Sequence, residues 1–110
     1  MKLYFSGWLL LFFTWFAAAP AAHAASRAQR QHGAEVFNTN GCLHCHTMGS
    51  LGGQKGPNLS DAGLKITPQA MRKQIVEGSK GMPAFRDVIE PKDLDDLIAY
   101  LRSCKTKSPK

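Results

Sequence analysis

The residues best suited to chemistry in this 110-residue sequence lie in the segment Cys42-Leu43-His44-Cys45-His46. Two thiols three positions apart, followed directly by an imidazole, form the pattern that attaches a haem c covalently. Each thiol can form a thioether bond to one vinyl group of the porphyrin, and the histidine then lies beneath the iron as its proximal ligand. The spacing therefore predicts one covalent haem c held by Cys42, Cys45 and His46, with His46 bound to the iron.

Two other uses of a Cys-x-x-Cys pair remain as alternatives. A structural zinc site takes four Cys or His ligands, usually from two such pairs, and Cys104 is the only other cysteine of the sequence. A thioredoxin-like dithiol is carried by a βαβ unit, and the sequence lacks the strand pattern of one. Haem attachment is therefore the favoured interpretation, with a zinc site or a dithiol as rivals.

An electron-transfer haem needs a second axial ligand, and methionine sulfur is a common choice. Met82 lies in a Gly-Met-Pro segment, and Pro83 keeps it out of the helical conformation. It follows His46 by 36 residues, which is enough chain to reach the opposite face of a haem. Met48 follows His46 too closely for this, and Met71 has the spacing of a core residue in a predicted helix. Met82 is therefore the predicted second iron ligand.

The N-terminus has the pattern of a secretory signal peptide. Met1-Lys2 is followed by the mostly apolar run 3–16, and Ala22-His23-Ala24 fits a small-residue cleavage site. We expect a signal peptide over residues 1–24 and one exported, periplasmic domain over residues 25–110. The alternative is an uncleaved membrane anchor, since the apolar run is close to the shortest length that can span a bilayer.

The elements that must position these residues are predicted to be helices. A polar lead-in to about residue 32 precedes a short helix over 33–37. Thr67 and Pro68 have the types favoured at the start of a helix, which we expect to run to Glu77 with Gly78 as its end. A last helix starts near Pro91. The residues expected to face the core of the last two helices are Ala70, Met71, Ile75, Val76, Leu94, Leu97, Ile98 and Leu101. No segment shows sustained strand alternation, so the predicted class is all-α.

Charge indicates the kind of partner. Residues 25–110 hold 13 basic and 8 acidic residues, a formal net charge of +5. This excess favours acidic redox proteins as electron donor and acceptor, with Lys55 and Lys80 expected near the exposed haem edge. Nucleic acid is not expected as a partner, because no basic helix face is interleaved with stacking aromatics. A membrane is expected as a partner only if the leader is uncleaved.

Three further residues, His32, His44 and Cys104, are not predicted to bind the haem. We expect His32 and His44 to be solvent-exposed rather than ligands. We expect a monomer, and Cys104 leaves two interpretations open. It can be a small apolar plug at the end of the last helix, or an exposed thiol that links two copies by a disulfide. The lysines that follow Cys104 are expected to lower its pKa.

The mature sequence resembles a small monohaem class I cytochrome c over about residues 30–103. Four parts carry the resemblance: the Cys42–His46 motif, the segment Gly56-Pro57-Asn58-Leu59, the segment Gly81-Met82-Pro83-Ala84-Phe85, and the pair Leu97 and Tyr100. It implies a haem-centred bundle of three to four helices in which Gly33 and Phe37 meet Leu97 and Tyr100. It also implies that the Pro57 carbonyl accepts a hydrogen bond from His46 Nδ1–H and so orients the ring.

The expected function is one-electron transport in a periplasmic chain, with His/Met ligation of the iron. Such saturated ligation leaves no open iron site for a substrate, so we expect no enzymatic activity. Two alternatives remain: an open-site haem protein that binds a ligand or catalyses a reaction, and a haem subunit of a larger oxidoreductase.

Overall fold

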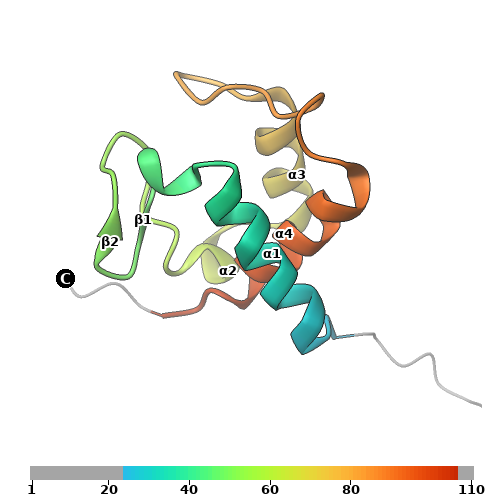
Figure 1. Cartoon of the computed structure of the whole chain (residues 1–110). Coiled ribbons are helices and arrows are strands. Elements are labelled where there is room, and N and C mark those ends of the chain that lie inside the picture. The colour runs from blue at the N-terminus through green and yellow to red at the C-terminus, as the bar shows by residue number, and fades with distance from the viewer. Residues whose placement is uncertain (1–23, 107–110) are drawn as a thin grey trace, which may run out of the picture.

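The computed structural model describes residues 24–106, which form a helical domain with one very short hairpin (Figure 1). Its elements, in chain order, are α1 (Arg27–Thr39), the 3₁₀ turn η1 (Cys42–His44), β1 (Thr47–Met48), β2 (Leu51–Gly52), α2 (Ala62–Lys65), α3 (Pro68–Glu77) and α4 (Pro91–Ser103). The all-α prediction is confirmed. The predicted leader, up to residue 23, lies outside the described residues. None of the helices within residues 24–106 has the length and hydropathy needed to cross a membrane.

Helix α1 begins earlier than the sequence analysis predicts. The Ser26 side chain accepts a hydrogen bond from Gln29 N, and the Gln29 side chain accepts one from Ser26 N, so the two residues form a capping box. The cap makes residues 27–32 helical, and the expectation of a polar lead-in to residue 32 was therefore wrong. The helix ends at Thr39, where the Asn40 side chain donates to Val36 O at 2.8 Å.

Helix α3 has the predicted bounds. Thr67 Oγ1 accepts from Ala70 N at 3.2 Å, and Gly78 follows the last helical residue with a φ of 65°. Met71 and Ile75, four residues apart, are both buried. Ala70 is exposed, contrary to prediction, because one residue corresponds to about 100° of helix rotation and turns it away from that stripe.

Helices α1 and α4 cross in close contact and form the frame of the domain (Figure 1). A Cβ added to Gly33 would lie 2.0 Å from the backbone oxygen of Asp96, so only glycine permits this approach. The rings of Phe37 and Tyr100 then pack with their centroids 5.6 Å apart. The predicted stripe of α4 is buried with them: Leu94, Leu97, Ile98 and Leu101.

A charged cluster joins α1 and α4 beside this crossing. Asp96 Oδ2 lies 2.9 Å from His32 Nδ1 and 2.8 Å from Lys92 Nζ, and the Asp96 side chain is only 3% exposed. His32 Nε2 also lies 3.7 Å from the Asp93 carboxylate. His32 is thus half-exposed and paired with carboxylates, and the expectation of a simply solvated histidine was wrong.

The chain after α4 packs on α2. Gly63 N donates to Cys104 O at 2.9 Å, and Thr106 N donates to Ser60 O at 3.1 Å. Cys104 is half-buried, and its thiol lies 3.5 Å from Tyr100 O. Burial raises the pKa of this thiol, so the expectation that the nearby lysines lower it was wrong.

The close approach of α1 and α4 predicts an unusual response to Gly33→Ala. Alanine at an unhindered helix position stabilises by about 1 kcal/mol relative to glycine. Here the new methyl group must push α4 away, and we expect the free energy of unfolding to fall by more than about 2 kcal/mol. The exposed control Gln31→Ala should change it by less than about 0.5 kcal/mol. Chemical denaturation measures both, and a Gly33→Ala variant as stable as the parent would contradict the described packing.

The buried carboxylate predicts a pH-dependent effect of Asp96→Asn. Hydrogen bonds from Lys92 and then His32 hold the pKa of Asp96 below its ordinary value of 3.8. A pKa that is lower in the folded state stabilises the fold above about pH 3.8, and this stabilisation is lost as pH falls through the folded-state pKa. Thermal unfolding should show Asp96→Asn less stable than the parent at pH 6, with the difference shrinking towards pH 2. The exposed Asp87→Asn is the control, and a constant difference across this range would refute the assignment.

Candidate functional site

One cavity of about 390 Å³ brings together most of the residues predicted to act. Three chain segments form it: residues 40–46, residues 55–56 and residues 80–85. Its lining includes the predicted attachment residues and the predicted second ligand: Cys42, Cys45, His46 and Met82. A smaller apolar cavity shares Cys42, His46 and Met82 and extends towards Leu59 and Leu97 in the core. Residues separated by 40 positions in the sequence therefore share one apolar site.

The Cys-x-x-Cys-His motif folds as a tight turn directly after α1. Gly41 has a φ of 69°, which favours glycine, and it starts the 3₁₀ turn. His46 N then donates to Cys42 O at 2.9 Å, which brings the first and last motif residues together. Both motif thiols are half-buried, and burial is the main cause that raises the pKa of Cys42. His44, in the spacer of the motif, is exposed as predicted.

The ring of His46 is fixed by the segment that follows the hairpin. Its Nδ1 lies 2.9 Å from the carbonyl oxygen of Pro57. A carbonyl can only accept, so Nδ1 carries the proton and Nε2 keeps its lone pair for a metal. Gly56 packs against the same ring: an added Cβ would lie 2.6 Å from His46 Cε1. The structure thus places Pro57 behind His46, as the resemblance implies.

A reversed loop after α3 carries Met82. Ser79 and Met82 pair through two backbone hydrogen bonds, of 3.1 and 2.8 Å. The turn between them places Lys80 at a φ of 48° and Gly81 at 91°. Lys80 is a non-glycine residue in the left-handed region, which is uncommon and costs conformational energy. This tight turn places Met82 in the lining of the same cavity as His46.

The sequence analysis missed a side chain that contacts Met82. Gln74 Nε2 lies 3.6 Å from Met82 Sδ, within hydrogen-bonding reach of sulfur, and also donates to Ser79 Oγ at 2.9 Å. Gln74 therefore braces the loop from α3. Gln74 lies on the exposed face of α3, where polar residues are common and no sequence pattern marks it out. Only the reversal of the chain at residues 78–82 brings Met82 near it. Met71, by contrast, is buried in the core, as its spacing predicts.

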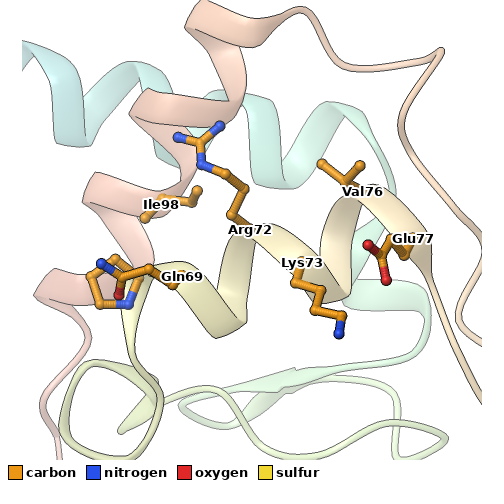
Figure 2. A pocket seen from close by; sticks show the side chains of 7 residues that line it. Gln69, Arg72, Lys73, Val76, Glu77 and Ile98 are labelled. Carbon is orange, nitrogen blue, oxygen red and sulfur yellow. The ribbon is translucent and has the colours of Figure 1, made fainter.

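A larger and more open cavity lies elsewhere, between α3 and α4 (Figure 2). It measures about 620 Å³ and is lined by Pro68, Gln69, Arg72, Lys73, Val76, Glu77 and Ile98. Figure 2 shows Arg72 reaching from α3 towards α4, where its guanidinium is paired with Asp95. This lining holds no cysteine, histidine or methionine, so the smaller cavity is the better candidate for redox chemistry.

Comparison with known proteins points to one family. Residues 28–101 match the family described as cytochrome c oxidase, cbb3-type, subunit III. The chain is 33% identical over 107 residues to cytochrome c6 of Nostoc sp., covering 92% of both chains. It is also 32% identical to the menaquinol:cytochrome c reductase cytochrome c subunit of Bacillus subtilis, covering 88% of this chain. The chain spans only 42% of the length of that subunit.

The fold is also found in solved structures. The c-type cytochrome SorU from Sinorhizobium meliloti superposes with a TM-score of 0.62 at 22% sequence identity. The match covers 73% of this chain and 94% of that one. At this identity the likeness shows the shared fold alone.

The residues around the cavity fit a covalently attached haem. The cavity volume lies in the range of about 300–1,000 Å³ that is usual for cofactor sites. Gly56 leaves space where any side chain would displace the His46 ring. The two thiols, an imidazole with its Nε2 lone pair free, and a thioether all border the same space. This donor set suits a haem c better than zinc, whose structural sites take four Cys or His ligands.

Proposed function

Since the chain belongs to the cytochrome c family and carries a covalently attached haem c, we propose that it is a one-electron carrier with His/Met ligation. Cys42 and Cys45 would hold the porphyrin through thioether bonds, and His46 and Met82 would bind the iron. When bound, the haem supplies reversible Fe(III)/Fe(II) chemistry. The observation that carries this proposal is the shared cavity of His46 and Met82.

The protein residues define how such a carrier works. Pro57 O accepts a hydrogen bond from His46 Nδ1–H and so fixes the orientation of the ring. Gln74 and the Ser79–Met82 pairing hold the sulfur at the cavity. With both His46 and Met82 bound, the iron would have no position left for a substrate, so we propose electron transfer rather than catalysis. The matched family and the Bacillus subtilis relative are named as subunits of an oxidase and a reductase. This favours a second candidate function, that of a haem subunit or domain of an oxidoreductase.

We assign residues 1–24 to a signal peptide and residues 25–110 to an exported domain that acts in the periplasm. The support is the apolar run and the Ala22-His23-Ala24 site of the sequence. Acidic redox proteins are the proposed partners, because Lys55 and Lys80 both line the cavity and are exposed. A monomer is proposed, since Cys104 is half-buried with a raised pKa, and a disulfide-linked dimer would need its thiol to become accessible.

Removal of the proposed sulfur ligand should open the iron. In Met82→Ala, the reduced protein should bind carbon monoxide readily, and the reduction potential should fall, because thioether ligation favours Fe(II). The far-red sulfur-to-iron band of the oxidised protein should disappear. Met71→Ala is the control: it removes a buried core thioether and should lower stability by about 2–5 kcal/mol while the band remains. The reverse pattern, with the band lost only in Met71→Ala, would contradict the ligand assignment.

Docking through the lysines should depend on salt. Raising the ionic strength from about 10 mM to about 150 mM shortens the Debye length from about 30 Å to about 8 Å. The electron-transfer rate with an acidic partner should fall about tenfold over this range in the parent. Stopped-flow kinetics should show a weaker dependence in the Lys55→Gln, Lys80→Gln double variant. Lys105→Gln removes an exposed lysine outside the cavity and should keep the parent dependence. If salt leaves the parent rate unchanged, the contact is not electrostatic.

A further inference from the structure

Ser60 is a buried side chain, only 5% exposed, at which three chain segments meet. Its Oγ accepts from Gly49 N at 2.7 Å and lies 2.6 Å from Asn58 Oδ1, to which it donates. Its backbone N donates to the same Asn58 oxygen at 2.9 Å, and its backbone O accepts from Thr106 N at 3.1 Å. One serine thus ties the hairpin turn and the chain after α4 to the segment that begins at Gly56.

This network leads directly to the ring of His46. Asn58 follows Pro57, so the two residues share the peptide plane that contains the carbonyl bonded to His46 Nδ1. Ser60 fixes the Asn58 side chain through two bonds, and this limits rotation of that plane. Leu59 N adds a third constraint, because it donates to the carbonyl oxygen of Thr47 at 2.9 Å. Thr47 is the residue that follows His46.

We propose that Ser60 is a positioning residue for His46: through Asn58 it holds the Pro57 carbonyl in place and thereby sets the strength of the His46 Nδ1–H hydrogen bond. The inference rests on the proposed role of His46 as an iron ligand. A firm Nδ1–H···O=C bond increases electron donation by the imidazole and stabilises Fe(III). Loosening the network should therefore expose the Nδ1 proton and raise the reduction potential.

Ser60→Ala removes the hydroxyl and its bonds to Asn58 and Gly49. In the reduced holoprotein, solvent exchange of the His46 Nδ1 proton, followed by NMR, should become roughly tenfold faster. The Fe(III)/Fe(II) equilibrium should shift roughly threefold towards Fe(II), which is about 28 mV at 59 mV per tenfold. Ser103→Ala is the matched control, because its hydroxyl bonds only the Tyr100 carbonyl, outside this network, and it should change neither quantity.

Asn58→Ala removes the acceptor of both Ser60 bonds, from Oγ and from the backbone N, and leaves the Gly49 bond in place. Asn58 is exposed, so this variant tests the proposal even if Ser60→Ala fails to fold. It should shift exchange and potential in the same direction, and the double variant should add little, since both residues act in one network. Lower thermal stability with unchanged exchange and potential would overturn the proposal and leave Ser60 a purely structural residue. A parent protein without the far-red sulfur band would instead refute the proposed His/Met ligation, so the two failures are distinguishable.

Discussion

The backbone contact at Gly33 is the constraint on which the rest of the domain depends. It brings α1 against α4, with Phe37 and Tyr100 packed beside the crossing. The end of α1 leads through Gly41 into the Cys-x-x-Cys-His turn, so the orientation of that helix decides where both thiols lie. Helix α4 supplies Leu97 to the apolar inner end of the cavity. The frame is therefore set by the close approach of two backbones, and the residues proposed to hold the haem are attached to it.

The two sides of the cavity are held in different ways. Around His46, hydrogen bonds join the hairpin and the segment 56–60, among them those of Leu59 N to Thr47 O and Gly49 N to Ser60 Oγ. Met82 follows a segment in which three residues have positive φ: Gly78, Lys80 and Gly81. The loop that carries Met82 is held by its own pairing and by Gln74. The histidine side is thus fixed by a network, and the sulfur side by a tight turn, the Gln74 side chain and a backbone bond from Phe85 N to Ile75 O.

Short-range signals in the sequence were enough to predict much of this arrangement. The Thr67-Pro68 start and the α4 stripe each report local geometry, and the structure agrees with both. The start of α1 was also readable, since Ser26 and Gln29 form a capping box, but the polarity of the segment hid it. The contacts of Gln74, Ser60 and His32 could not be predicted, because each joins segments whose approach depends on loop reversals or on helix crossing. The pKa of Cys104 was misjudged because burial of the thiol, which the sequence does not reveal, raises it.

Together these features describe a small cytochrome c in which Pro57 orients the His46 ring and the loop after α3 places the Met82 sulfur at the same cavity. X-ray absorption at the iron edge of the oxidised and reduced holoprotein tests this central claim most directly. The account predicts one thioether sulfur together with nitrogen ligands in both oxidation states. An iron with nitrogen ligands alone, or with an open coordination position in either state, would contradict it.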